Sequence, residues 1–293
     1  MAQMKYLLVF WMVSNALGIM AQDKPAYRLL SAEGKTMKYR KALKLATDAD
    51  IIFFGELHNN PIAHWLQLEL LHDLTATRGA DQVVAGAEMF ETHQQPALTA
   101  YFAGEMEQDA FEDSLKLWPN YATDYRPVVE FCREKDIPFI ATNVPRQYAR
   151  QVSRQGVDSL LNLPAEELSL LVPLPFPIDY ELPGYAAMRE MLSGHGGDLN
   201  PEFFIAAQAI KDATMAHNIL KHWQAGKLFY HLNGAYHSDN QEGITWYVRK
   251  QAPEANILTI SVVEQEDISS LSEDNRNKAD LIIVVPETMT KTY

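Results

Sequence analysis

The stretch IIFFGELHNNP at residues 51–61 and the stretch FYHLNGAYHSDN at residues 229–240 follow one pattern. Each starts with an apolar run typical of a strand, passes through a Gly-x-x-His turn, and ends in polar residues that can cap a helix. The glycine permits the sharp turn off the strand. We therefore predict two strand–GxxH–helix elements, related by internal duplication. They would present His58 and His237 in one pocket at the carboxyl edge of a sheet, where α/β proteins usually bind ligands.

The rest of the chain extends this alternation of strands and helices. Further apolar runs that fit buried strands lie at residues 83–88, 138–142, 257–263 and 281–285. Helix-period patterns lie at residues 62–77, 127–135, 146–155, 201–225 and 243–250. This order predicts an α/β fold with a mostly parallel central sheet flanked by helices.

Two segments do not fit the alternation. Residues 92–125 read as a helical insertion rich in aromatic side chains, and residues 173–200 are too rich in proline and glycine for regular structure. The second is a candidate lid or binding element. Because no linker-like change in composition occurs, we predict a single domain over residues 23–293 that carries both insertions.

Polar residues at the ends of other strands complete a candidate site. Glu88 follows an apolar run as Glu56 does, and Arg146 begins a helix after the run at 138–142. If these strands are neighbours, Glu56, His58, Glu88, Arg146 and His237 converge on one polar pocket, where they could act as acids and bases. The alternative is that the glutamates cap helices and the histidines bind loop carbonyls.

Three of these residues have the chemistry of metal ligands, because two histidines and a carboxylate suit a divalent transition metal. His58, His237 and Glu88 are the candidates. On the predicted helix at 201–225, Gln208 and Asp212 share a face, which places a polar pair under the pocket or in an ordinary core helix.

Composition narrows the classes of function. The chain has 293 residues, with 38 Asp and Glu against 25 Lys and Arg, so its formal net charge is −13. Binding nucleic acid without regard to sequence needs a basic surface, so we expect no nucleic-acid partner. The single cysteine, Cys132, excludes an internal disulfide or a multi-cysteine metal site, and we expect it to be buried.

The first 22 residues have the layout of a secretory signal peptide. Lys5 precedes the apolar run at 6–13, and the small residue Ala21 stands near the end. The run is short for a transmembrane helix, although a membrane anchor is the competing interpretation. A lipoprotein anchor would need a cysteine after the apolar run, and none is present. We therefore predict a soluble exported protein, periplasmic or extracellular.

Several motifs together resemble the ChaN-like haem-binding family, part of a superfamily with the Tiki proteases, TraB proteins and erythromycin-esterase-like enzymes. The motifs are residues 52–61, 88–91, 142–146, 207–216 and 233–237. The resemblance covers about residues 49–251, and it implies an exported haem-binding protein of iron or haem acquisition. The partners would be haem, a second copy of the chain in a homodimer, and a haem-transport receptor.

The resemblance also implies a tyrosine or histidine ligand for the haem iron. The segment at 173–200 offers Tyr180, Tyr185 and His195 as ligands and Arg189 for a propionate. We predict that this segment binds haem and that the sheet-edge site is separate, because its glutamates would repel propionates. A lid without haem is the alternative.

The resemblance to Tiki proteases leaves an enzyme open. A metal-dependent hydrolase would use the same GxxH and glutamate residues, and haem degradation is a third hypothesis. No G-x-S-x-G, Walker A or G-x-G-x-x-G pattern occurs in a suitable context. The sequence alone does not separate a carrier from an enzyme, because both need these residues at the sheet edge.

Overall fold

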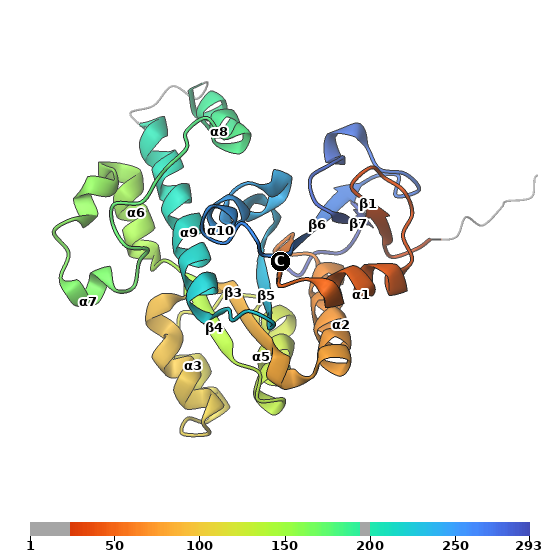
Figure 1. Cartoon of the computed structure of the whole chain (residues 1–293), viewed down its shortest axis with the longest axis horizontal. Coiled ribbons are helices and arrows are strands. Elements are labelled where there is room, and N and C mark those ends of the chain that lie inside the picture. Colours follow the sequence, from red (N-terminus) through yellow and green to blue (C-terminus); the bar gives the residue numbers. More distant parts are fainter. Residues whose placement is uncertain (1–23, 194–199) are drawn as a thin grey trace, which may run out of the picture.

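The central sheet confirms the predicted α/β class. A computed structural model describes residues 24–193 and 200–293, in which seven strands form one sheet in the order β1-β7-β6-β2-β5-β3-β4 (Figure 1). Only β1 among these runs antiparallel to its neighbour, β7, and the other neighbours are parallel. The strands are β1 Arg28–Ser31, β2 Ile51–Glu56, β3 Val83–Glu91, β4 Phe139–Asn143, β5 Leu228–Gly234, β6 Ile257–Gln265 and β7 Leu281–Pro286.

The two GxxH elements start from adjacent strands. β5 pairs with β2 on one side and with β3 on the other, in a register that places Glu56 opposite Gly234. Parallel neighbours end at the same edge of a sheet, so the two turns emerge side by side. This confirms the prediction that the two GxxH turns share one sheet edge.

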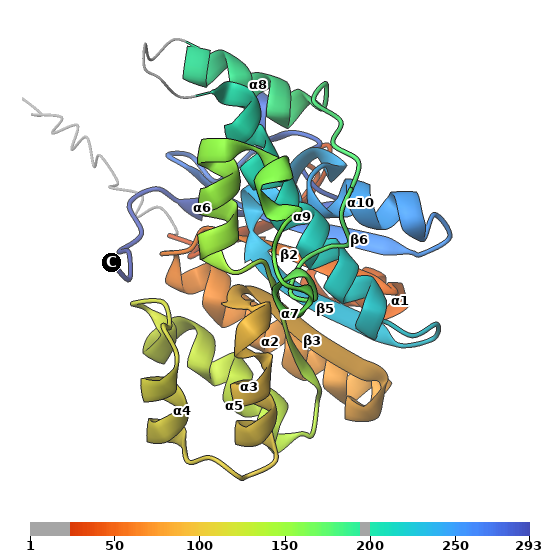
Figure 2. The ribbon, with the colours of Figure 1, turned by 90° about the vertical axis from the view of Figure 1, so that its left-hand side faces the viewer.

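Helices cover both faces of the sheet. In Figure 2, α6 and α9 lie on one side of the strands, and α2 and α5 lie on the other. The α-helices are α1 Tyr39–Asp48, α2 Pro61–Arg78, α3 Gln95–Phe102, α4 Gln108–Ser114, α5 Arg126–Glu134, α6 Arg146–Gln155, α7 Ala165–Leu168, α8 Pro183–Ser193, α9 Pro201–His222 and α10 Ile244–Gln251.

The period-two pattern of β2 divides the core into two layers. Ile52 and Phe54 join the apolar cluster under α1, α2 and α5, while Ile51 and Phe53 join the cluster under α6, α9 and α10. All four side chains are buried, as expected for a strand covered on both faces. This continuous apolar run is what made the strand readable from sequence.

The two insertions differ from the prediction in opposite directions: the first is less continuous than expected, and the second is more regular. The segment at 92–125 breaks into α3, α4 and a π-helical turn at Tyr121–Tyr125, instead of one continuous helix. The segment at 173–200 contains α8, which begins at Pro183, because proline fits the first helical turn, where no N–H donor is needed. The prediction that this segment is wholly irregular was wrong.

The sequence analysis missed β1 and α1. β1 has four residues, and in α1, YRKALKLATD, only the small side chains of Ala42 and Ala46 are buried. The predicted signal peptide lies outside the described residues. In the described part of the chain, no helix combines the length and the apolar character needed to cross a membrane.

Candidate functional site

The structure brings the predicted polar residues together. One pocket at the carboxyl edge is lined by His58, Glu88, Arg146 and His237, and the fifth predicted residue, Glu56, lies against His58. The pocket confirms that the two histidines face a common space and that Glu88 points into it. The order of β2, β5 and β3 produces this convergence, because each strand delivers its polar residue to the same edge.

Glu56 is a buried acceptor and does not cap a helix. Its Oε1 accepts hydrogen bonds from the Tyr125 hydroxyl at 2.6 Å and lies 2.9 Å from Nδ1 of His58. Its Oε2 accepts from Nε2 of Gln67 at 2.6 Å. The helix cap that the alternative interpretation assigned to Glu56 is supplied by Asn60, whose side chain accepts from the N–H groups of Ile62 and Ala63.

His58 is the histidine that the pocket exposes. One third of its side chain (33%) is accessible, and its ring lies 4.7 Å from the ring of Trp118. Burial lowers the pKa of His58, but the bond to Glu56 and the charge of Glu88 outweigh burial and raise it above its ordinary value. A partly exposed imidazole held by a buried carboxylate can take up or release a proton within the pocket.

His237 lies between two buried carboxylates. Its Nδ1 is 2.5 Å from Oδ1 of Asp212, and its Nε2 is 3.2 Å from Oε1 of Glu88. Burial opposes the charge, yet the charges of Glu88 and Asp212 raise the pKa of His237 to about 10. Burial likewise opposes ionisation of Glu88, but His237 and His58 hold the pKa of Glu88 well below its ordinary value. The three side chains therefore form a charged triad.

Asp212 and Gln208, both on α9, contact the imidazole of His237. The Gln208 amide nitrogen lies 3.0 Å from Nδ1 of His237, next to the Asp212 contact. This confirms the interpretation that the polar pair on α9 packs beneath the pocket. Because α9 crosses the sheet at this edge, the i and i+4 spacing of the two residues brings both to the same imidazole.

Close packing explains why a glycine stands at position 234, the last residue of β5. A side-chain Cβ there would lie 2.7 Å from Nε2 of His58 and 3.5 Å from Oε2 of Glu88. Its N–H donates to the same glutamate oxygen at 2.8 Å. Glu88 lies inside β3, at an irregularity in its pairing with β4, and not at the end of its strand as predicted. The irregularity replaces the strand end as the means of turning the carboxylate into the pocket.

A second buried network lies behind Glu56, and the sequence analysis found little of it. Nε2 of His64 lies 3.1 Å from the His58 carbonyl oxygen and 3.4 Å from Oδ2 of Asp124. The Asn120 amide donates to the same carbonyl oxygen and to Asp124. Asn120, Asp124 and Tyr125 come from the aromatic insertion, where no local pattern marks them as part of a site. Gln67 lies one turn beyond His64 on α2, a spacing that could have pointed to it.

The segment at 173–200 contacts the residues of the sheet-edge site, and its predicted role as a separate haem site stays a prediction. The hydroxyl of Tyr185 on α8 donates to Oδ2 of Asp212 at 2.9 Å, and Asp212 contacts His237. Tyr185 is therefore continuous with the charged triad. Glu56 and Glu88 both have close hydrogen-bond donors, so neither carboxylate is buried without a partner.

The other haem candidates differ in their surroundings. Burial and Asp212 raise the pKa of Tyr185, so the phenol is held protonated. Tyr180 is half-buried, and its hydroxyl makes no hydrogen bond to any described residue. Nε of Arg189 lies 2.9 Å from Glu202, and Glu181 is also near. His195 lies outside the described residues, so its predicted role stays a prediction.

The geometry gives little support to the predicted metal site. Nε2 of His237 and Oε1 of Glu88 are already paired with each other. Across residues 24–193 and 200–293, no group of three His, Cys, Asp or Glu side chains is arranged to hold a metal ion. Binding of a divalent metal by His58, His237 and Glu88 stays a prediction, and it would require the His237–Glu88 pair to open.

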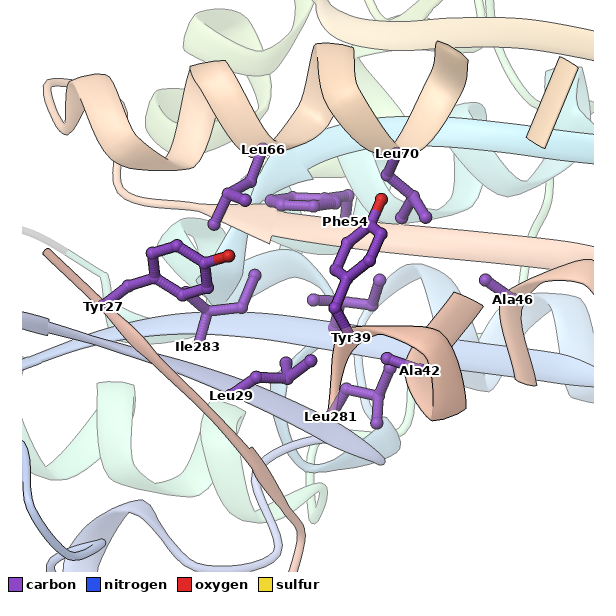
Figure 3. A pocket seen from close by; sticks show the side chains of 11 residues that line it. Tyr27, Leu29, Tyr39, Ala42, Ala46, Phe54, Leu66, Leu70, Leu281 and Ile283 are labelled. Carbon is purple, nitrogen blue, oxygen red and sulfur yellow. The ribbon is translucent and has the colours of Figure 1, made fainter. Parts of the chain in front are cut away.

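A second hollow, among α1, α2 and β7, has a different character (Figure 3). Its walls are apolar side chains such as Phe54, Leu66 and Ile283, with the phenol rings of Tyr27 and Tyr39 at its side. The Tyr39 hydroxyl donates to Asp73. Apart from the two phenols, the side chains that line this hollow are apolar, in contrast to the charged lining of the pocket at the carboxyl edge.

Comparisons with known proteins agree with the fold. The profile of a family described as haem-binding uptake, Tiki superfamily, ChaN matches residues 42–248. The structure of ChaN of Campylobacter jejuni, described for its cofacial haem binding, superposes with a TM-score of 0.66 at 16% identity, covering 90% of this chain and 98% of that one. A Bacillus cereus protein superposes with a TM-score of 0.51 at 11% identity, covering 89% and 95%. No curated protein sequence matches significantly.

Proposed function

The chain belongs to the ChaN family of haem-binding uptake proteins in the Tiki superfamily, and from this we propose that it is an exported haem-binding protein of iron or haem acquisition. One observation carries the proposal: the family match at residues 42–248 contains both GxxH turns, the charged triad and all of α9. The site itself adds aromatic and apolar side chains beside charged ones, as an amphipathic plate such as haem requires.

The segment around α8 offers groups suited to haem. Tyr180 is half-buried with an unbonded hydroxyl, and the apolar side chain of Met191 is 60% exposed. A phenolate is a hard ligand that suits ferric haem, which supplies redox and ligand-binding chemistry when bound. Tyr180, Tyr185 and His195 are the proposed ligands. For Tyr185 to serve, its hydroxyl would have to leave Asp212, which could accept the phenol proton.

Titration with hemin tests the proposal. We expect a shifted Soret band and saturable binding for the purified protein. Tyr180→Phe, Tyr185→Phe and His195→Ala, singly and combined, should weaken binding or change the ligand-to-metal bands. Tyr148→Phe is the matched control for Tyr185→Phe, because Tyr148 is also a buried tyrosine bonded to a carboxylate, Glu167, but lies on α6. A protein that does not bind hemin would overturn the proposed function.

The export part of the proposal rests on the layout of Lys5, the apolar run at 6–13 and Ala21. We propose cleavage near Gln22, which leaves one domain over residues 23–293. Expression in a Gram-negative host, fractionation and amino-terminal sequencing test this. Exported protein that still starts at Met1 would contradict cleavage, and protein confined to the cytoplasm would contradict export.

A metal-dependent hydrolase is the second candidate, and one observation favours it. His58 is partly exposed, oriented by buried Glu56, and stands beside the Glu88–His237 pair, an arrangement that could activate water. Metal analysis of protein purified without chelators, followed by peptide and ester hydrolysis assays with added Mn²⁺, Co²⁺ or Zn²⁺, tests it. Activity abolished by His58→Gln in protein that does not bind hemin would favour the enzyme.

A further inference from the structure

The pocket that holds His58 and His237 continues on its outer side into another hollow, which is distinct from the apolar one in Figure 3. The two hollows share Glu91 and Arg146 in their linings. The inner one has the charged triad at its floor, and the outer one opens beside the start of α6. Basic side chains recur along both hollows, which we call the cationic groove: His93, Lys116, Arg146, Arg150 and Lys211.

Three of these side chains lack an internal counterion. Lys116, Arg150 and Lys211 form no ion pair with any residue in the described part of the chain, and Lys211 is half-buried. Such a concentration of unpaired cations stands out on a chain with a net charge of −13. Beneath the groove, the Glu88 carboxylate is buried and paired with His237.

Glu91 marks where an anion fits. Its Oε2 accepts the N–H of Arg146 at 3.0 Å, at the first residue of α6, and Oε1 is 3.8 Å from Nε of the same arginine. His93 lies 3.5 Å from Oε2. A single carboxylate thus occupies the middle of a set of donors, at the positive end of a ten-residue helix. One carboxylate leaves most of the cations unused.

We propose that the cationic groove binds a multiply charged anion and, resting on the proposed function, that this anion is the pair of propionates at the edge of haem. Carboxylates such as propionates form strong charge-assisted hydrogen bonds with arginine and lysine side chains. The inner hollow is linked to α8 through His237, which lines it and contacts Asp212, the acceptor of the Tyr185 hydroxyl. A plate that lies against α8 would thus have its acidic edge near these cations.

Pyrophosphate titration tests the anion site without haem. Wild-type protein at low ionic strength should bind pyrophosphate, and Arg150→Gln and Lys211→Gln should each weaken binding about fivefold. The controls Arg154→Gln and Lys221→Gln remove the same charge from the same two helices outside the groove. Absent binding, or equal binding by all five proteins, would overturn the anion site.

A comparison of haem with its dimethyl ester shows whether the anion in the groove is a haem propionate or a free phosphate-like ion. If propionates occupy the groove, wild-type protein should prefer haem over the ester by at least about fivefold, and Arg150→Gln with Lys211→Gln should abolish that preference. Equal binding of haem and ester would overturn the propionate assignment and leave a free phosphate-like anion as the occupant. Failure of both porphyrins to bind would refute the proposed function, while the pyrophosphate arm still decides the anion site.

Discussion

His237 shows how a single residue gains its properties from its surroundings. Its imidazole is 6% exposed, and it carries a proton because Asp212 and Glu88 flank its two nitrogens. An isolated buried histidine would be neutral, as His231 shows: burial lowers the pKa of His231 to about 4. Both histidines are buried on the same strand–turn element, so burial alone does not explain why their pKa values differ. The neighbouring carboxylates decide whether the imidazole is charged.

Removing one carboxylate from the triad should cost stability in a pH-dependent way. The folded pKa of His237 is raised from 6.5 to about 10, so its contribution is fully present below pH 6.5 and is lost as the pH rises through 10. Asp212→Asn should lower the free energy of unfolding by about 3 kcal/mol near pH 6, because it leaves a buried charge with one partner fewer.

Urea denaturation of wild type and Asp212→Asn at pH 6 and pH 10 measures this difference. The gap should shrink at the higher pH. His72→Gln is the control, since His72 is exposed and contacts Phe131 without a carboxylate partner. A gap that stays the same at both pH values would show that His237 is neutral throughout.

The lone thiol should be inert in the folded state. Cys132 on α5 is fully buried in the apolar layer under α2, and burial raises its pKa. A thiol-specific disulfide reagent should therefore react with Cys132 only after denaturation. Rapid labelling of native protein, measured by the released chromophore, would contradict the packing of α5.

At the scale of elements, the two GxxH turns are alike in sequence but differ in what surrounds their glycines. A Cβ on Gly55 would lie 2.9 Å from the Ala235 Cα and 3.0 Å from the Ile260 carbonyl oxygen. Both are backbone atoms of neighbouring segments, which cannot move alone. A Cβ on Gly234 would meet the tip of the His58 side chain, which is partly exposed and can rotate.

Alanine substitutions at the two glycines should therefore differ in how much they destabilise the fold and in whether they disturb His58. Gly55→Ala should destabilise the fold by about 2 kcal/mol, because the sheet must shift. Gly234→Ala should cost less than about 1 kcal/mol but displace His58 from Glu56, so the pKa of His58 should fall toward its ordinary value. Thermal unfolding and histidine NMR titration distinguish these outcomes. Equal destabilisation, with His58 unchanged, would refute the argument.

At the scale of the whole molecule, the sheet couples the two apolar layers. The same strand contributes Ile52 and Phe54 to one layer and Ile51 and Phe53 to the other. Neither layer can lose its packing without disturbing β2. The two insertions add to these layers instead of forming cores of comparable size: Phe111 and Tyr121 belong to the first, and Leu174, Phe176 and Ile178 pack against the second.

A single cooperative unfolding transition should follow from this shared strand. Far-ultraviolet and near-ultraviolet circular dichroism should give coincident curves over urea for residues 23–293. Leu71→Ala in the first layer and Val152→Ala in the second should shift both curves together, since each side chain is fully buried. Separate transitions, each shifted by one substitution alone, would indicate two domains.

Local sequence was sufficient for the elements and for the edge at which they present polar residues. Apolar runs such as 51–54 are short, continuous and bounded by glycine, which identifies buried parallel strands. Residues that directly follow such a run must emerge at the carboxyl edge, so Glu56, His58 and His237 could be placed before the structure was known. Short or polar elements such as β1 and α1 escaped because they bury too little to carry a periodic signal.

Tertiary structure alone decided which of these residues meet. The insertion of β5 between β2 and β3 puts His237 beside Glu88, although about 150 residues separate them along the chain. The packing of α8 and α9 ties Tyr185 to Asp212 and so links the segment at 173–200 to the sheet-edge residues. Pairing over such separations depends on strand order and helix packing, which local periodicity does not encode. The charges of the site residues also depend on the tertiary structure, because a pKa is set by burial and by neighbours that exist only in the folded chain.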